Sequence, residues 1–120
     1  MRLPNAQNAV VDIAKLRDYC LNPAHPKGKH KARAFLEKLG FTQSDAERLR
    51  QLILAGILLP EVMAMEQEPT PFGRRFVVDL EIQRGEGIVL SRAHVRTAWI
   101  IRHGEDFPRL TTCFCPQRSQ

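Results

Sequence analysis

A cluster of cations stands at the expected start of a helix, in the segment Lys27–Arg33. The first backbone N–H groups of a helix lack partners within it, and together with the helix dipole they favour anions. Lysine and arginine add charge to such a position, and histidine adds a group that titrates near neutral pH. We therefore expect phosphate contacts here, and an ordinary solvated helix start is the alternative. The residues concerned are Lys27, Lys29, His30, Lys31 and Arg33.

A second group of polar side chains falls on one face of the expected strands, because strand residues alternate between two faces. Cleavage of RNA without a metal uses such side chains. A base takes the proton of the 2′-hydroxyl, and cations stabilise the pentavalent phosphate. A sheet face that is merely wet carries similar residues, so this alternative stays open. The group comprises Arg75, Asp79, Glu81, His94, Arg96, Arg109 and Thr111.

Two cations and two histidines are the leading candidates within these groups. Lys31 lies one turn into a helix, and Arg96 is a long cation in the middle of a strand, so both are expected to contact phosphate. An ion pair between Arg96 and Asp79 is the alternative. His94 shares a strand face with Arg96, and His30 adjoins Lys31, so either histidine is the expected proton-transfer group.

The run Pro108–Thr112 is a third feature, a turn followed by a strand rich in hydroxyl groups. A hydroxyl such as that of Thr111 is able to donate a hydrogen bond to a phosphate oxygen, and Arg109 adds a cation beside it. Threonine is also common in strands for packing reasons alone. The catalytic candidates are thus His30, Lys31, His94, Arg96, Arg109 and Thr111, and the nucleic-acid-binding candidates are Lys27, Lys29, Arg33 and Arg75.

The composition favours one small basic domain with a polyanionic partner. The chain has 120 residues and a formal net charge of +5. Nucleic acid is the commonest cytoplasmic polyanion, and acidic proteins respond to the same field. The chain contains no P-loop, nucleophile elbow, dinucleotide fingerprint or zinc-protease motif. This argues against an NTPase, a serine hydrolase or a dehydrogenase.

The apolar segments and the cysteines favour a cytoplasmic location. The N-terminus has no apolar signal region, and the longest apolar run, Leu52–Leu59, is too short to span a bilayer, so no membrane contact is expected. An odd number of cysteines, Cys20, Cys113 and Cys115, indicates free thiols in a reducing compartment. Cys113 and Cys115 lie on one face of an expected strand, but no second ligand pair follows, so no metal and no cofactor are expected.

Apolar residues at helical spacing predict the first two of about three helices between residues 12 and 58. Asp12 is a suitable N-cap for a helix over Ile13–Leu21, which the following prolines end. Gly28 opens a second helix, whose apolar positions follow an amphipathic pattern and place Leu36 on its buried face. Gly40 is a suitable C-terminal cap for that helix.

A third helix is expected from a capping box of Ser44 and Glu47 up to Pro60. Residues 60–71 are rich in proline and acidic residues, so they are expected to form a connection. Beyond Pro71 the apolar period changes from helical to two, which indicates strands.

Three strand patterns follow, separated by a turn at Arg84–Gly87 and another near Gly104. The second strand is expected over Ile88–Arg102, with Trp99 buried against the helices near Phe35, Phe76 and Phe114. In the last strand, alternation places Leu110, Thr112 and Phe114 on the inward face and Arg109, Thr111 and Cys113 on the outward face.

Helices followed by consecutive strands predict an α+β fold, with N-terminal helices packed on a C-terminal antiparallel meander of three to four strands. One domain is expected over residues 1–120, with a helical half at 12–58 and a sheet half at 72–116.

Several stretches, in their order and spacing, resemble a largely uncharacterised bacterial domain family over nearly the whole chain. These stretches are Leu3–Ala6, Lys15–Tyr19, Leu21–Pro23, His25-Pro26, Gly28, Lys31–Phe35, Phe72-Gly73, Arg75–Asp79, Val95–Ile100 and Pro108–Thr112. The family occurs as standalone proteins and at the C-terminal ends of contact-dependent inhibition and other polymorphic toxins. By its motifs, the resemblance implies roles for Lys31, Arg75, Arg96, Arg109 and Thr111.

The position at toxin tips implies an effector domain, and the order of helices and strands is similar to the barnase, EndoU, colicin E5/D and RelE-like ribonucleases. This step is an analogy of fold. The resemblance implies a metal-independent endoribonuclease toxin that cleaves tRNA or mRNA, neutralised by a small acidic antitoxin or immunity protein. The alternatives are a non-catalytic module that binds an acidic protein or nucleic acid, and an antitoxin or immunity-type protein.

Overall fold

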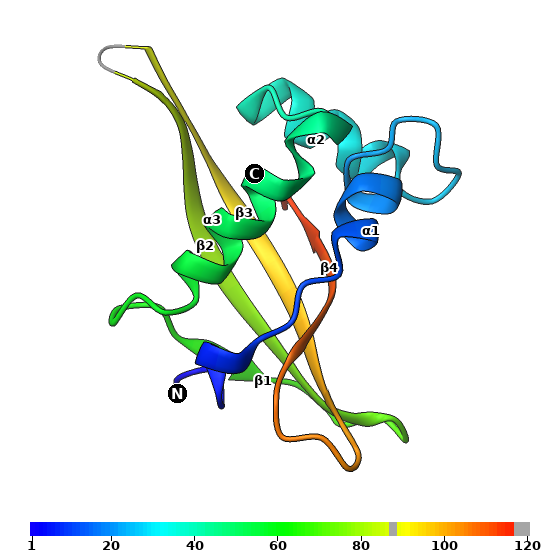
Figure 1. The fold of residues 1–120 in the computed structure, drawn as a ribbon, viewed down its shortest axis with the longest axis vertical. Helices are drawn as coiled ribbons and strands as arrows, with labels where there is room; N and C mark the ends of the chain where they lie inside the picture. The colour runs from blue at the N-terminus through cyan, green and yellow to red at the C-terminus, as the bar shows by residue number, and fades with distance from the viewer. Residues whose placement is uncertain (87–88, 117–120) are drawn as a thin grey trace.

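The computed structural model describes residues 1–86 and 89–116 and confirms the α+β fold (Figure 1). Within these residues, helices come first and four antiparallel strands follow. None of the described helices combines the length and apolarity needed to cross a membrane. The helical elements are η1 (Ala6–Asn8), α1 (Ile13–Lys15), η2 (Leu16–Cys20), α2 (Lys29–Leu39), η3 (Gln43–Asp45) and α3 (Ala46–Gly56). The strands are β1 (Ala64–Glu66), β2 (Gly73–Glu86), β3 (Val89–Arg102) and β4 (Arg109–Phe114).

The first expected helix forms as two joined pieces, α1 and the π-helix η2. The Asp12 carboxylate caps α1 by accepting a backbone N–H of its first turn at 3.0 Å. Beyond α1 the regular helix predicted up to Leu21 gives way to wider π turns, closed by a 2.8 Å bond from the Leu21 N–H to the Leu16 carbonyl. Such turns are rare and occur often at functional sites.

The second helix, α2, buries a narrower face than its sequence predicted. Ala32, Phe35 and Leu39 are buried, but the side chain of Leu36 is 52% exposed. The helix ends at Gly40, whose N–H donates to the Leu36 carbonyl at 2.8 Å and whose positive φ of 68° turns the next N–H, that of Phe41, back to the Phe35 carbonyl at 3.3 Å. This is the glycine cap that the sequence predicted.

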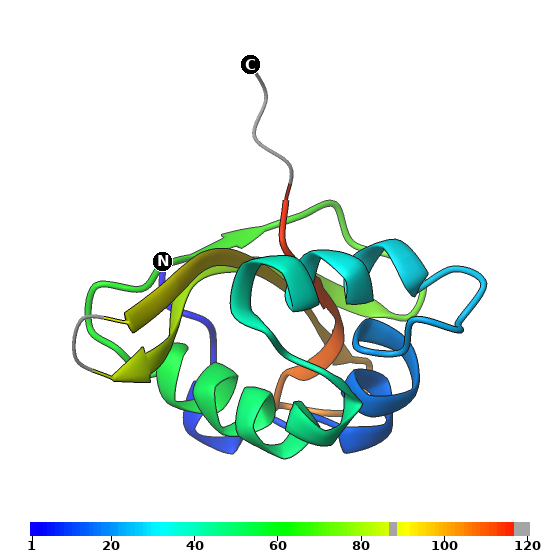
Figure 2. The same cartoon turned by 90° about the horizontal axis from the view of Figure 1, so that it is seen from above.

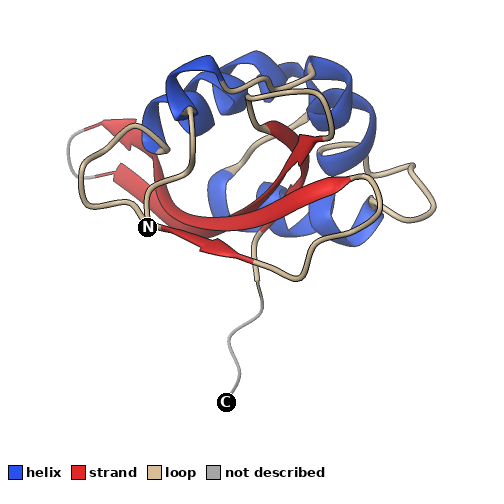
Figure 3. Cartoon of the chain, turned by 90° about the horizontal axis from the view of Figure 1, so that it is seen from below, coloured by secondary structure: helices blue, strands red, loops and turns tan. Residues whose placement is uncertain are grey.

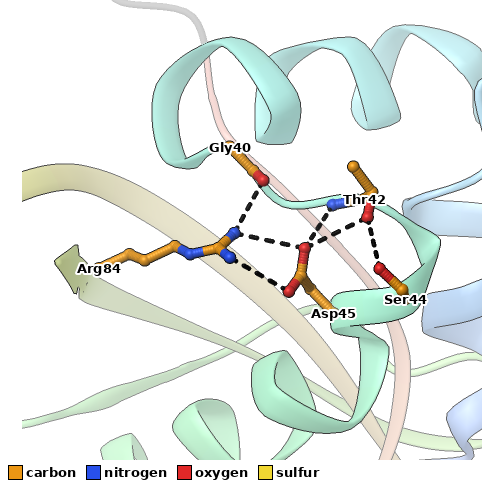
Figure 4. A network of polar contacts seen from close by, with 5 residues as sticks. All are labelled: Gly40, Thr42, Ser44, Asp45 and Arg84. Carbon is orange, nitrogen blue, oxygen red and sulfur yellow. Dashed lines mark hydrogen bonds and ion pairs between the residues drawn. The ribbon is translucent and has the colours of Figure 1, made fainter.

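A clamp of polar groups joins the α2–α3 connection to β2 (Figure 4). The capping box is formed by Thr42 and Asp45, not by the expected pair Ser44 and Glu47, because the turn η3 precedes α3. The Asp45 carboxylate accepts the backbone N–H of Thr42 at 2.8 Å. Arg84 of β2 donates to the carbonyl that ends α2 at 2.7 Å and to both Asp45 oxygens at 3.3 Å.

The strands lie in the sheet in chain order, β1-β2-β3-β4. β1 pairs Ala64 with Val78, inside the segment 60–71 that the sequence predicted only as a connection. β2 continues through Glu86, so the prediction of a turn that begins at Arg84 is wrong. Gly87 of that turn and Ile88 of the next predicted strand lie outside the described residues.

The helices pack mainly on one face of a curved sheet, and the other face is open (Figures 2 and 3). α3 packs against β2, whereas α2 lies beside the sheet and contacts β3 and β4. Trp99 is 1% exposed, and its indole N–H donates to the Thr97 hydroxyl at 2.8 Å. The inward residues of β2 and β3 are the predicted ones, including Phe76, Val78, Leu80, Ile82, Val95, Thr97, Trp99 and Ile101.

A β-bulge in β4 changes which side chains face the core. Trp99 pairs with Leu110 and the preceding Ala98 pairs with Thr112, so Thr111 is an extra residue in the ladder. The Thr111 hydroxyl donates to the Ala98 carbonyl at 3.1 Å. One inserted residue shifts the alternation of every later side chain to the opposite face.

The predicted faces of β4 are therefore wrong from Thr112 onward. Cys113 and Cys115 are buried, whereas Thr112 and Phe114 are only partly buried and occupy the outer face. The sequence expected Phe114 in the core near Trp99, but the bulge turns its ring toward the side of the sheet that carries Arg96. This shift assembles the site described next.

Candidate functional site

The side chain of Lys31 reaches from the first turn of α2 to the edge strand β4. Its Nζ donates to the Tyr19 hydroxyl oxygen at 2.7 Å and to the Thr112 hydroxyl oxygen at 2.9 Å. Nζ also lies 4.5 Å from the centre of the Tyr19 ring and 5.6 Å from that of Phe114. We call these four residues the Lys31 cluster. Its members come from η2, α2 and β4, so only the folded chain brings them together.

Two donors of the Lys31 cluster are left for a ligand. An ammonium group has three hydrogens, and Lys31 uses two of them for hydroxyl oxygens. The Tyr19 hydroxyl oxygen accepts a hydrogen bond from Lys31. Among the described residues, no group accepts the hydrogen of this hydroxyl in turn. No ion pair within the described residues includes Lys31. A half-buried cation beside a free hydroxyl suits an anion with several oxygens.

The loop before α2 holds Tyr19 against the start of that helix. The Nδ1 atom of His25 accepts the backbone N–H groups of Lys27 at 3.0 Å and Gly28 at 2.9 Å. Its ring packs edge-on against Tyr19 with 4.8 Å between the ring centres. A Cβ atom at Gly28 would lie 2.3 Å from the Tyr19 carbonyl oxygen, so this approach requires glycine.

Two buried thiols lie behind Thr112. The Cys20 sulfur is 3.8 Å from the Thr112 hydroxyl oxygen. The hydrogen bond from the Cys113 thiol lowers the pKa of Cys20 against the opposing effect of burial, with smaller help from the Cys113 backbone, Thr112 and Lys31. The same contact, with burial, raises the pKa of Cys113. The Thr112 hydroxyl oxygen thus contacts both the Cys20 sulfur and the Lys31 ammonium group.

An open pocket of about 370 Å³ adjoins the Lys31 ammonium group. His30, Lys31 and Ala34 line it from α2, and Phe114 and Cys115 line it from the end of β4. His30 is exposed at this pocket. Two histidines, His30 and His94, were predicted to transfer a proton. Of these two, His30 lines a pocket together with Lys31.

Arg96 and His94 lie on the open sheet face, and both contact Asp79. Arg96 donates through Nε and Nη2 to the two Asp79 oxygens at 2.8 and 3.0 Å. His94 Nε2 is 3.3 Å from Asp79 Oδ2. The hydrogen bonds from Arg96 lower the pKa of Asp79, and His94 adds a smaller effect in the same direction. The ion pair considered as the alternative is thus present, although Arg96 still adjoins Phe114 across the strands.

The other predicted residues of the strands are engaged outside the Lys31 cluster. Arg109 donates to both oxygens of Glu105 at 2.9 and 2.8 Å. The Thr111 hydroxyl is bound to the backbone of β3 at the bulge. Arg75 donates to the Glu68 carbonyl at 2.9 Å.

The basic segment at the start of α2 is divided between two sides of the helix. Lys31 faces β4, whereas Lys29 and Arg33 line a separate groove beside the α2–α3 connection. Arg33 forms an exposed ion pair with Glu37 at 3.0 Å, and Lys27 is exposed in the preceding loop. The segment is therefore not one continuous cationic surface.

Sequence reasoning missed Tyr19, His25, Thr112 and Phe114 as site residues. Thr112 and Phe114 were assigned to the core because nothing in the local pattern marks the bulge. Tyr19 and His25 do fall in stretches that carry the family resemblance, and this was their only signal. Within the described residues, no three His, Cys, Asp or Glu side chains are grouped to hold a metal ion.

Comparison with known proteins gives a family assignment. The family model described as "Domain of unknown function (DUF6883)" matches residues 2–117. No curated protein and no solved structure matches the chain. The match spans nearly the whole chain, as expected for the uncharacterised family that the sequence resembles.

Proposed function

This chain belongs to the DUF6883 family, and we propose that its Lys31 cluster is the active centre of a metal-independent endoribonuclease. The observation that carries the proposal is a half-buried ammonium group held by two neutral hydroxyls, with one hydrogen left over. A phosphodiester supplies the missing counter-charge and the acceptor oxygens. The net charge of +5 favours a polyanionic phosphodiester ligand, a class to which RNA belongs.

The proposed reaction is attack of the RNA 2′-hydroxyl on the adjacent phosphorus. His30 accepts the 2′ proton while the 2′ oxygen bonds to phosphorus and the bond to the 5′ oxygen breaks. The Tyr19 hydroxyl gives its proton to the leaving 5′ oxygen, and the Lys31 ammonium stabilises the charge left behind. Lys31 also stabilises the pentavalent phosphate. The products are a 2′,3′-cyclic phosphate and a 5′-hydroxyl.

The sheet face has a subsidiary role in this proposal. Arg96 adjoins Phe114 and keeps one nitrogen, Nη1, outside its bonds to Asp79, so it is available for a neighbouring phosphate. His94 remains the alternative base, since Asp79 orients its ring. Lys27, Lys29, Arg33 and Arg75 are proposed to attract the RNA at longer range.

The test measures cleavage of total tRNA and mRNA by purified protein in EDTA, with the ends of the products identified. We expect cyclic phosphate ends from the wild type and loss of cleavage in Lys31→Met and His30→Ala. Lys15→Met, which removes an exposed lysine of α1, is the matched control and retains cleavage. Persistence of cleavage in His30→Ala with loss in His94→Ala would transfer the role of the base to His94.

A second candidate function is RNA binding without cleavage. It is favoured by the position of His30, because no hydrogen bond within the described residues orients its exposed ring. In that case the wild type binds RNA in a manner that depends on Lys31, and no product ends form.

A small acidic antitoxin or immunity protein is the proposed protein partner. The net charge of +5 and the exposed cations of the α2 start support it. Coexpression with a neighbouring gene that encodes a small acidic protein should relieve growth arrest, if this chain causes it.

A further inference from the structure

A groove of about 690 Å³ lies on the side of α2 away from the Lys31 cluster. A helix turns by about 100° per residue, so Lys29, Arg33 and Leu36 share one side and Lys31 points from roughly the opposite one. The groove runs between this side of α2 and the α2–α3 connection. Its apolar lining includes Leu21, Pro23, Leu36 and Phe41.

The groove has an apolar floor and a cationic rim. Leu36 was expected in the core, yet 52% of its surface is exposed. Lys29 and Arg33 stand beside it, and no carboxylate is among the residues that line the groove. The pair of Arg33 with Glu37 is fully on the surface, so it exchanges readily for another carboxylate. The positive end of the α2 dipole adds to the same potential.

We propose that this groove binds an acidic, amphipathic segment of a partner protein. An apolar side chain of the segment covers Leu36, and its flanking carboxylates meet Lys29 and Arg33. This pairing of an apolar anchor with opposite charges at the rim is the usual form of helix-in-groove recognition. RNA fits less well, because Phe41 of the apolar floor is 1% exposed and offers little ring surface on which a base could stack.

The wall of the groove opposite α2 is fixed before any partner arrives. Arg84 holds both the end of α2 and Asp45 (Figure 4). Its guanidinium also lies 5.0 Å from the centre of the Phe41 ring. Thr42 and Ser44, which line the groove, are joined through their hydroxyls at 2.8 Å. A preformed groove binds a segment with less loss of conformational entropy.

Occupation of the groove also affects the Lys31 pocket. His30 lines both the groove and that pocket, so a segment seated in the groove stands next to the proposed active centre. We infer that the bound partner obstructs RNA. This consequence alone rests on the proposed function, whereas binding in the groove does not.

The test uses the whole chain and a short labelled peptide with leucines at i, i+4 spacing and glutamates at the positions that flank this apolar stripe. Fluorescence anisotropy measures affinity, and amide chemical shifts locate the contact. We expect saturable binding that weakens about tenfold or more in Leu36→Ser and in Lys29→Glu/Arg33→Glu. Leu58→Ser is the matched control, because Leu58 is 49% exposed and lies outside the groove, and it should bind as the wild type does.

Five outcomes decide the matter. Absence of saturable binding, or shifts outside α2 and its connection, overturns the inference. Equal binding of a peptide with lysine in place of glutamate also overturns it. Self-association that Leu36→Ser abolishes assigns the groove to a second copy of the chain instead. Peptide binding by a folded wild-type protein that cleaves no RNA keeps this inference and rejects the proposed function.

Discussion

Two cations, Lys31 and Arg96, approach Phe114 from different elements, and their surroundings are opposite. Arg96 sits on the open sheet face with both Asp79 oxygens at 2.8 and 3.0 Å. Lys31 is held by two hydroxyls and has no carboxylate partner among the described residues. A phosphate at Arg96 would therefore compete with Asp79, whereas a phosphate at Lys31 would have no carboxylate of the described residues to displace.

The comparison teaches that a count of cations does not locate an anion site. Arg74 and Arg109, like Arg96, make paired contacts with a carboxylate. Such pairs on a surface contribute modestly to stability and neutralise the local field. A cation held only by neutral groups, as Lys31 is among the described residues, is the better indicator of an anion site.

The largest expected effect is on RNA cleavage, where removal of Lys31 should cost far more than removal of Arg96. Lys31→Met should lower kcat/KM for RNA about 100-fold or more, because it removes a donor to the pentavalent phosphate. Arg96→Met should lower it about threefold or less, because its charge is already neutralised. Steady-state cleavage of a short fluorogenic RNA measures both values. Equal losses of kcat/KM in the two variants would contradict this difference and would indicate a phosphate bound between the two side chains.

The second largest effect is expected at Gly28, the glycine that lets the start of α2 approach Tyr19. Gly28→Ala places a Cβ atom 2.3 Å from the Tyr19 carbonyl oxygen. We expect a loss of about 2 kcal/mol in unfolding free energy and at least about tenfold slower cleavage, since the helix start must shift. Gly56→Ala is the control: its nearest contacts, at 3.1 and 3.2 Å, are flexible ends of Leu80. It should cost less than about 1 kcal/mol and spare cleavage.

Two adjacent threonines give a finer test. Thr112→Val removes an acceptor of Lys31, so we expect RNA cleavage about tenfold slower with stability nearly unchanged. Thr111→Val removes a bond to the Ala98 carbonyl, so we expect a loss of about 1 kcal/mol in stability with cleavage retained. Urea unfolding and kinetics on the two variants check this. The reverse pattern would mean that Thr111, as the sequence predicted, donates to the phosphate.

The smallest effect concerns the pH dependence of the sheet face. Because Arg96 lowers the pKa of Asp79 below its ordinary value of 3.8, the pair stabilises the fold above that pH, and this stability is lost as pH falls through the lowered pKa. Asp79→Asn should reduce unfolding free energy by about 1 kcal/mol at neutral pH, and by less at strongly acidic pH.

Urea titrations at several pH values measure this difference. In an Arg96→Gln background the contribution of Asp79 should largely disappear at every pH. A constant difference between wild type and Asp79→Asn down to strongly acidic pH would contradict the assigned role of the pair.

Local signals were sufficient for most of the fold. Apolar spacing places Phe35 and Leu39 of α2 inward, and period-two alternation correctly buries Phe76 and Trp99. Gly40 ends α2 because a positive φ favours glycine there. The short strand β1 was missed because its partner lies in β2 and its own sequence has few apolar residues that alternate.

By itself, the sequence determined the α+β order and the basic character, since these depend on composition and local period, and it singled out Lys31 as a candidate site residue. Only the tertiary structure decided what surrounds Lys31. The bulge at Thr111 depends on pairing with β3, and it moves Thr112 and Phe114 to the outer face. Contacts between residues that are distant in the sequence also decide which cation is neutralised. Arg96 and Asp79, for example, are 17 positions apart. Pairings between distant residues leave no local period, so they become visible only once the chain is folded.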